Sequence, residues 1–291
     1  MNLGKALLDI PIKDATSHIF RRPFLSVDAT DHMLQIATIL AIGPQIYVDG
    51  LVVINSNKRP IGRISSKHII SNILARGYPE WLESTAEQMM DEFAGAIDRN
   101  LHLRKAIEVF DKTRFAFVPI IAEEDDDDEN SEAAVVIASL SIRDILPLIA
   151  KANIDRSIKH ISSPLVSVNE NTTIKDAVDL MFKKGIRNVG VKHNVDDANN
   201  NKLLRIINDR KILEFLLSHD GKELMRKNGI VGLADADIIN HLDMIIAKSV
   251  MCDTTASRAA ELLIDIHNPF LILEDGGGDY SIVTPWDIVM K

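Results

Sequence analysis

A short motif recurs four times along the chain, and its copies begin at Ser65, Ser141, Asn208 and Thr284. Each copy follows an apolar segment with the pattern of a β-strand and leads into an apolar segment with the pattern of a helix. The first and third copies (65 to 208) lie 143 residues apart, and so do the second and fourth (141 to 284). This equal spacing indicates a pair of units that was duplicated once, so the chain is predicted to be a repeat protein.

An amphipathic helix is predicted upstream of each motif. Apolar residues recur there at positions i, i+3, i+4 and i+7, which lie on one face of a helix. The four sets are Met33, Ile36, Ala37 and Leu40; Leu103, Ala106, Ile107 and Phe110; Ile174, Ala177, Val178 and Met181; and Ala256, Ala259, Ala260 and Leu263. Because one template fits all four segments, the helix is predicted to have the same place in every repeat.

Two of the repeats open with a similar strand. Residues 23–28 and 164–169 both begin with proline, which a strand tolerates at its first residue. No such leading strand is predicted in the second and fourth repeats, which supports pairing of an odd-numbered repeat with an even-numbered one. Each repeat is predicted to have the order β-α-β-β-α.

The fold class is therefore α/β, with repeats at residues 10–78, 84–152, 154–218 and 242–291. A unit of roughly 60 residues buries little apolar surface and is only marginally stable alone. The repeats are expected to pack as two pairs, and the pairs to form a flattened disc. A monomer could build this disc from one chain, and a head-to-tail homodimer could build it from two.

The charge balance disfavours two classes of partner. The chain has 33 Lys and Arg against 42 Asp and Glu, a formal net charge of −9. Negative charge repels phosphate groups, so neither nucleic acid nor an anionic membrane is an expected partner. The acidic run at residues 123–129 is interpreted as a solvated loop rather than a metal site, because it lacks glycine and spaced ligands.

Several other classes are disfavoured by the absence of their signatures. Cys252 is the only cysteine, so one chain has neither a disulfide nor a thiolate metal cluster. Without a membrane-length apolar stretch or a signal-peptide pattern, the protein is predicted to be cytoplasmic. No catalytic constellation or metal-ligand spacing is found, and the glycines at 276–278 are interpreted as a turn. The protein is predicted not to be an enzyme and to require no cofactor.

The β-α-β-β-α order and the strand–Ser/Thr-x-x-Asp–helix ending resemble cystathionine-β-synthase-type (CBS) domains. Residues 284–288 (Thr-Pro-Trp-Asp-Ile) match this ending best, followed by residues 141–145 (Ser-Ile-Arg-Asp-Ile). The resemblance covers about residues 10–291. With four such repeats, the chain resembles stand-alone archaeal CBS proteins and the gamma subunit of AMP-activated protein kinase. It implies adenosyl ligands in clefts between paired repeats, and a partner or attached domain that responds to their binding.

The fourth residue of the motif differs between the repeats. It is Asp144 or Asp287 in the even-numbered repeats, but His68 or Lys211 in the odd-numbered ones. The first residue is a good helix N-cap in every copy, and an acid three positions later would complete a capping box. A cation at this place opposes the helix dipole, yet two repeats have one. The acid is therefore interpreted as dispensable for the helix and kept for another use.

The resemblance implies that this use is ribose binding. A carboxylate accepts hydrogen bonds from both ribose hydroxyls, so Asp144 with Ser141 and Asp287 with Thr284 are the expected ribose pairs. His68 and Lys211 cannot replace a carboxylate in this role. Their two clefts are expected either to be empty or to supply a cation to a phosphate bound in the neighbouring cleft.

The remaining contacts of the nucleotide are assigned by the same resemblance. Ile142, Ile282 and Val283 are candidates for the adenine wall, although each could equally be an ordinary core residue. Arg187, Arg114 and His267 precede the second strand of their repeats and are candidates for phosphate binding. The alternative for these three is an exposed charge at a helix end, where the dipole favours it.

Two functions of different classes remain open. The first is a regulatory protein that binds AMP, ADP or ATP and changes the affinity of an unknown protein partner. The second is an interaction scaffold whose clefts no longer bind a ligand. Binding of S-adenosylmethionine or nucleic acid is a weaker alternative, the latter because of the net negative charge.

Overall fold

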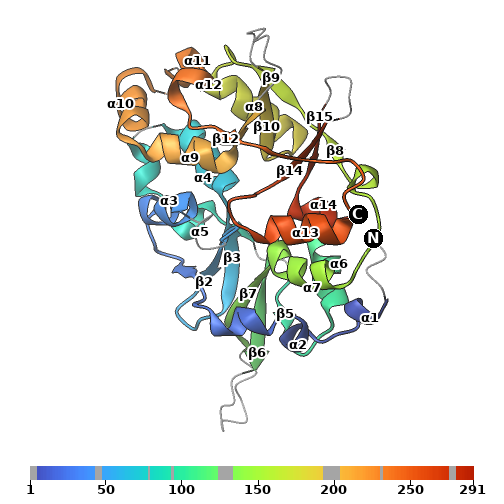
Figure 1. Cartoon of the computed structure of the whole chain (residues 1–291). Helices are drawn as coiled ribbons and strands as arrows, with labels where there is room; N and C mark the ends of the chain where they lie inside the picture. Colours follow the sequence, from blue (N-terminus) through green and yellow to red (C-terminus); the bar gives the residue numbers. More distant parts are fainter. Residues whose placement is uncertain are drawn as a thin grey trace.

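The structure is a computed structural model that describes residues 5–42, 48–77, 79–92, 95–123, 134–192, 204–229, 232–274 and 280–291. The acidic run from residue 124 onward and the glycines at 276–278 lie outside the described residues. Short helices and strands alternate along the whole chain (Figure 1).

The four repeats share the predicted β-α-β-β-α order. The first consists of β1 (Ser26–Asp28), α3 (Met33–Ile42), β2 (Leu51–Ile54), β3 (Pro60–Ile64) and α4 (Ser66–Arg76). The second consists of β5 (Ile97–Asp98), α6 (Leu103–Thr113), β6 (Phe117–Glu123), β7 (Ala134–Ser141), the 3₁₀ turn η4 (Ile142–Ile145) and α7 (Leu146–Lys151). The third consists of β9 (Ser167–Asn169), α8 (Ile174–Lys184), β10 (Asn188–Lys192), β11 (Arg205–Asn208) and α9 (Asp209–Leu217). The fourth consists of β13 (Lys248–Val250), α13 (Ala256–Ile264), β14 (Leu271–Glu274), β15 (Tyr280–Val283) and α14 (Pro285–Met290).

The second and fourth repeats have the leading strand that the β-α-β-β-α order requires, although the sequence showed no proline-led strand there. These strands, β5 and β13, pair in parallel with β6 and β14, as β1 pairs with β2 in the first repeat. They are only two and three residues long and have neither an initial proline nor an alternating apolar pattern. They form because they pair with the neighbouring strands β6 and β14, and a local sequence pattern does not predict such pairing.

Connecting segments join the repeats and complete their sheets. These segments are α1 (Lys5–Leu8), α2 (Ile12–Ala15), η1 (Ser17–Arg21), η3 (Glu80–Glu83), α5 (Ala86–Met89), β4 (Asp91–Glu92), η5 (Ile158–His160), β8 (Ser163–Pro164), α10 (His219–Asn228), α11 (Gly232–Asp235), α12 (Ile238–His241) and β12 (Ile245–Ile246). The sheet orders are β1-β2-β3-β4, β5-β6-β7, β12-β11-β10-β9 and β13-β14-β15-β8. Since β8 precedes the third repeat but pairs with the fourth, the two repeats of the second pair are interlocked.

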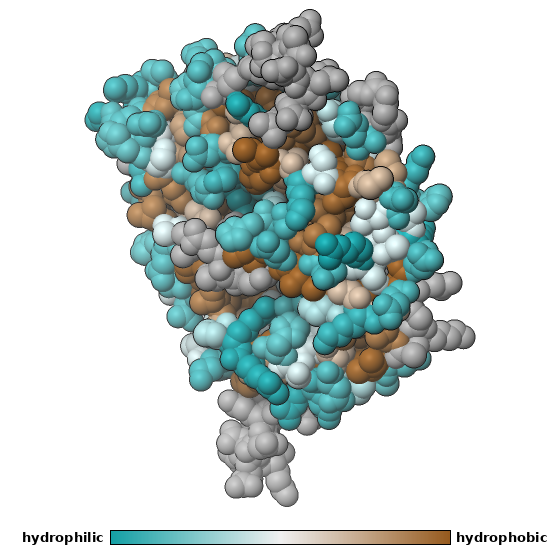
Figure 2. Space-filling model, in the orientation of Figure 1, coloured by the Kyte–Doolittle hydropathy of each residue, from teal (hydrophilic) through white to brown (hydrophobic). Residues whose placement is uncertain are grey.

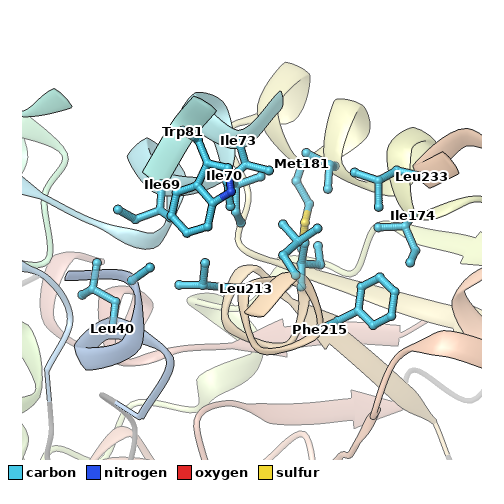
Figure 3. Packing of buried hydrophobic residues seen from close by; sticks show 14 of the residues in the cluster. Leu40, Ile69, Ile70, Ile73, Trp81, Ile174, Met181, Leu213, Phe215 and Leu233 are labelled. Atoms are coloured by element: carbon cyan, nitrogen blue, oxygen red, sulfur yellow. The ribbon is translucent and has the colours of Figure 1, made fainter. Parts of the chain in front are cut away.

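The helices join the two pairs through two hydrophobic cores. One core contains buried residues of the first and third repeats, and α9 contacts both α3 and α4 there. Figure 3 shows this contact, with Ile69, Ile73 and Trp81 of the first pair facing Leu213 and Met181 of the second. The other core joins the second and fourth repeats, where α7 lies beside α13 and α14 (Figure 1). The four repeats thus pack as two pairs that meet at these two cores.

The predicted apolar helix faces account for much of these cores. Met33, Ile36, Ala37 and Leu40 of α3 are all buried, with no more than 1% exposure. The corresponding residues of α8 and α13 are buried too, and in α6 only Ile107 is less than fully buried. The helical spacing therefore identified the faces along which the repeats pack.

Hydrophilic residues cover most of the face shown in Figure 2, and hydrophobic residues are visible in patches between them. No helix in the described part of the chain combines the length and the apolar character that a membrane span requires.

Candidate functional site

A central cavity of about 1230 Å³ lies between the repeats. All four motifs contribute to its lining, through Ser65, Ile142, Asn208 and Thr284 among others. Of the predicted site residues, it brings together Thr284, Asp287, Arg187, Arg114, His267, Ile142 and Ile282. Ser141, Asp144 and Val283 are not part of its lining. The cavity exceeds the range of roughly 300–1,000 Å³ that is usual for small-molecule sites, so it can accommodate a nucleotide.

The lining of this cavity is richer in positive than in negative side chains. Its Lys and Arg residues are Lys67, Arg114, Arg143, Arg187, Arg210, Lys211 and Lys291. Its acids are Asp49, Asp91, Asp209, Glu214 and Asp287. The formal balance is therefore positive, in a chain whose net charge is −9. Such a local excess favours an anionic ligand inside the cavity.

All four motifs start a helix as predicted. Ser65, Ser141 and Thr284 each form a capping box with the residue three positions later, and the Asn208 side chain accepts the Lys211 N–H at 2.9 Å. In both even-numbered repeats the acid takes part through its Oδ2 atom, which accepts the N–H of the N-cap residue. The acids of these two repeats therefore also cap their helices, although α9 forms without an acid at this position.

His68 performs the same capping role without a carboxylate. Its Nδ1 atom lies 3.0 Å from the N–H of Ser65 and 2.9 Å from the Ser65 hydroxyl oxygen. Since a backbone N–H can only donate, Nδ1 is the acceptor, and Nε2 carries the proton toward Asp91 at 3.1 Å. The ring is thus a neutral acceptor rather than the cation that the sequence analysis assumed.

Removing this acceptor has a predictable effect on stability. We expect His68→Ala to lower the free energy of unfolding by about 1 kcal/mol, as the loss of a helix cap does. His68→Asn should recover most of it, because the amide oxygen can accept the Ser65 N–H. Urea unfolding of the two variants checks this, and equal losses for both would show that the capping bond contributes nothing.

Lys211 does not cap its helix with its side chain. Its Nζ atom instead donates to Glu214 at 2.7 Å, and both residues line the cavity. The cleft of the third repeat therefore lacks a carboxylate at the ribose position, as the sequence indicates. Lys211 stands as a paired cation on the cavity wall.

The Asp287 carboxylate is buried, with 5% exposure, at the edge of the central cavity. Its Oδ2 atom accepts the Thr284 N–H at 2.8 Å and the Thr284 hydroxyl at 2.6 Å. Its Oδ1 atom accepts the Ser163 hydroxyl at 3.2 Å and lies 2.8 Å from Nζ of Lys291. The Lys291 side chain is 42% exposed, and such pairs exchange readily with solvent. One oxygen of Asp287 is thus held by groups that can move.

The Asp144 carboxylate is also buried, but its partners are different. Arg22 donates to both of its oxygens at 2.8 Å, and His18 Nε2 lies 3.1 Å from Oδ1. The Ser141 N–H adds a bond of 2.7 Å to Oδ2. Burial by itself would raise the pKa of Asp144, but the hydrogen bond with His18 and the charge and hydrogen bonds of Arg22 together lower it. In this structure Arg22, His18 and the Ser141 N–H already bind the carboxylate that was predicted to accept the ribose hydroxyls in the second repeat.

Arg187 belongs to a network that connects the two pairs. Its Nε atom donates to Asp209 at 3.0 Å, and its terminal nitrogen lies 3.8 Å from Asp49 of the first repeat. Asp49 also pairs with Arg210 at 3.3 Å. The charge of Asp209 is the main reason that the pKa of Arg187 is raised, whereas burial lowers that of Arg210. These arginines remain charged, with carboxylates already beside them.

The other two phosphate candidates lie at the cavity with weaker partners. Arg114 pairs with Asp111 at 3.5 Å, is 72% exposed, and its guanidinium lies 5.9 Å from the ring of Trp286 in the fourth repeat. His267 is exposed, and its backbone N–H donates to Asp265 at 3.0 Å. These side chains are less committed to partners than Arg187 is.

The predicted adenine wall is divided between the cavity and the core. Ile142 and Ile282 line the cavity, whereas Val283 has 0% exposure and belongs to the core of the even-numbered repeats. Successive residues of a strand point to opposite faces, so Ile282 and Val283 of β15 cannot share one wall. The assignment of Val283 to the wall is therefore corrected.

Phe115 occupies the space beside the first motif. The Arg63 guanidinium lies 3.2 Å from the centre of its ring, and the His68 ring stacks on it at 6.0 Å with an interplanar angle of 22°. These contacts hold the Phe115 ring at the wall of the central cavity, which Ser65 and His68 also line.

Sequence reasoning missed several residues of the site. Asp49 and Lys291 contact the predicted site residues Arg187 and Asp287, and Arg210 pairs with Asp49. Arg22 binds Asp144. Arg210 is adjacent to Lys211 within the motif and could have been noticed there. Arg22 carries a clearer signal, because it immediately precedes the proline of the first leading strand.

Comparison with known proteins matches the first and third repeats to a family. The CBS domain family matches residues 14–75 and 156–218. Protein MJ1225 from Methanocaldococcus jannaschii, described as a proposed archaeal homologue of γ-AMPK, superposes with a TM-score of 0.76 and 16% identity, over 96% of this chain and 99% of that one. An uncharacterised conserved protein from Pyrococcus horikoshii superposes with a TM-score of 0.53 and 15% identity, over 92% and 94%. No curated protein matches the sequence. At these identities the structural likenesses establish the fold alone.

Proposed function

We propose that this chain, which is built of CBS repeats, is a non-catalytic regulatory protein that binds an adenine nucleotide in its central cavity. The observation that carries the proposal is the position of Asp287. It is a buried carboxylate beside the hydroxyl of Thr284, at the wall of a cavity that is large enough for a nucleotide and has a positive lining.

The ribose would bind at Asp287. Among the described residues its Oδ1 atom contacts Ser163 and Lys291, and two ribose hydroxyls can replace them as donors. Lys291 would then be released toward the cavity, where it could contact a phosphate. The Oδ2 atom would keep its bonds to Thr284 and would continue to cap the helix.

The base and the phosphates would extend along the cavity from that point. Ile282 and Leu165 offer apolar surface near Asp287, and Ile142 lies on the part contributed by the second repeat. Arg114, Arg187 and His267 are the candidate phosphate ligands. Arg114 is the most available of them, because its guanidinium is largely exposed.

Regulation would follow from the position of the cavity between the two pairs. A ligand that contacts both pairs binds best to one arrangement of them and therefore stabilises that arrangement. A partner protein that recognises the same arrangement would bind more tightly when nucleotide is present, and the coupling would be reciprocal. Nucleotide levels would in this way control the association.

We expect Asp287→Ala to weaken AMP binding by roughly 10- to 100-fold, the effect of losing one charged hydrogen-bond acceptor. Isothermal titration calorimetry of AMP, ATP and S-adenosylmethionine into both proteins measures this effect. Asp179→Ala is a matched control, because Asp179 is an exposed acid that pairs with Lys175 on α8, outside the cavity lining. Unchanged affinity of Asp287→Ala for every ligand would refute the ribose assignment.

A scaffold without a ligand is the second candidate, and one observation favours it. Asp144, Asp287 and Arg187 all have charged protein partners in this structure. A cleft whose polar groups satisfy one another does not need a ligand for stability. If the unmodified protein shows no binding heat with any of the three ligands, and carries no nucleotide after purification, the scaffold is the better description.

A further inference from the structure

The two pairs carry different residues at one equivalent position. The leading strands at residues 23–28 and 164–169 align from their initial prolines onward. The residue before the proline is Arg22 in the first pair and Ser163 in the second. This position was not among the predicted site residues.

The structure supports the equivalence of these two positions. In the second pair, Ser163 of β8 pairs with Ile282 of β15, two residues before Thr284. In the first pair, the Arg22 guanidinium donates to the carbonyl of Ser139, two residues before Ser141, at 3.0 Å. Both residues therefore meet the last strand of the even-numbered repeat at the same point of the motif.

The two side chains bind the neighbouring acid with different strengths. Arg22 binds Asp144 through two charged hydrogen bonds of 2.8 Å. Ser163 gives Asp287 a single neutral hydrogen bond of 3.2 Å. Asp287 also pairs with Lys291 at 2.8 Å, but that side chain is 42% exposed. Because a bidentate charge-assisted contact is stronger than a neutral bond and an exposed ion pair, Asp144 is held more firmly than Asp287.

The small volume of the cavity beside Arg22 supports a closed cleft at Asp144. The cavity next to Arg22, Ser139 and Ser141 measures only about 50 Å³, room for a few water molecules but not for a nucleoside. Asp49 and Phe117 line both this cavity and the central one, so the two adjoin. A ribose would have to displace the guanidinium to reach Asp144.

We propose that the residue before the leading proline determines which cleft accepts a ribose, with Arg22 closing the cleft at Asp144 and Ser163 leaving the cleft at Asp287 open. This inference rests on the proposed function, because it concerns the same ligand class. It predicts one AMP per chain, bound at Asp287.

Exchanging the two residues tests the proposal. Calorimetric titration of AMP should give one site for the unmodified protein and two for Arg22→Ser, and the added site should be lost in Arg22→Ser/Asp144→Asn. Ser163→Arg should weaken AMP binding at Asp287 by at least tenfold. Arg22→Lys is the matched control, because it keeps a positive charge beside Asp144 and should leave one site.

Thermal unfolding of each variant is measured first, because Arg22→Ser removes hydrogen-bond partners of a buried acid. If Arg22→Ser is unstable, Ser163→Arg still tests the inference independently.

The outcomes separate this inference from the proposed function. If the unmodified protein binds AMP but Arg22→Ser gains no site and Ser163→Arg loses none, the inference is wrong while the proposed function stands. If the unmodified protein does not bind AMP but Arg22→Ser binds one, closure by Arg22 is supported and the proposed function fails. If no variant binds AMP, both are overturned.

Discussion

Asp144→Ala is expected to lower the free energy of unfolding by about 3 kcal/mol, the lower end of the range for breaking a buried ion pair. The substitution removes the acceptor of two Arg22 hydrogen bonds and of the Ser141 N–H. Arg22 would then remain against the protein without a counter-charge. Because its side chain is 32% exposed, water can partly replace the carboxylate, which keeps the loss from being larger. Urea unfolding of the two proteins measures the difference.

A double-mutant cycle separates the pair from the capping bond. We expect Arg22→Ser/Asp144→Ala to be more stable than the sum of the two single losses predicts, because neither charge is then left alone. Additive losses would show that Arg22 and Asp144 do not stabilise one another. Asp287→Ala is a useful comparison, since its partner Lys291 is more exposed and the loss should be smaller.

The stabilisation from Asp144 should also depend on pH in one direction. Its pKa in the folded protein is lowered by His18, Arg22 and the Ser141 amide, which outweigh the effect of burial. In the unfolded chain the value is about 3.9. The contribution of the Asp144 carboxylate to the free energy of unfolding is therefore fully present above the pKa of the unfolded chain. It is lost as the pH falls through the pKa of the folded protein. The stability difference between the unmodified protein and Asp144→Asn should shrink below about pH 4, and a difference that grows in acid would contradict the assignment.

The elements with strong periodic patterns were predictable from the sequence. The helix faces that begin at Met33, Leu103, Ile174 and Ala256 are buried, because helical spacing is enforced by the core. The N-caps were predictable for a local reason, since an N-cap side chain bonds to an amide only two or three residues away. The family resemblance depended on these two kinds of signal, and the fold agrees with it.

The rest depended on contacts between distant segments. Arg22 and Asp144 are 122 residues apart, and no local pattern brings them together. The β5 and β13 strands form only beside their partners, so they carry no pattern of their own. The role of His68 was missed because residue type alone suggests a cation, whereas the hydrogen bond from Ser65 requires a neutral acceptor. Comparing the two pairs position by position would have revealed the difference between Arg22 and Ser163.

The second large effect is expected at Trp81, which has 0% exposure in the core that joins the first and third repeats. Trp81→Ala should lower the free energy of unfolding by about 3–5 kcal/mol, the usual result of deleting a buried aromatic ring. Figure 3 shows the indole close to Ile69, Ile70 and Ile73 of α4, and η3 also contacts α3. The cavity left by the ring would therefore loosen α4, whose first turn carries the His68 cap.

Trp81→Phe separates the packing of the ring from its polar atom. The indole Nε1–H is buried and has no hydrogen-bond partner among the described residues, so Trp81 incurs a desolvation cost that phenylalanine does not. We therefore expect Trp81→Phe to lose only about 1 kcal/mol, despite its smaller volume. Urea unfolding of both variants measures these losses. If Trp81→Phe were as damaging as Trp81→Ala, the indole N–H would have to be contributing through a partner, and packing alone would not explain the position.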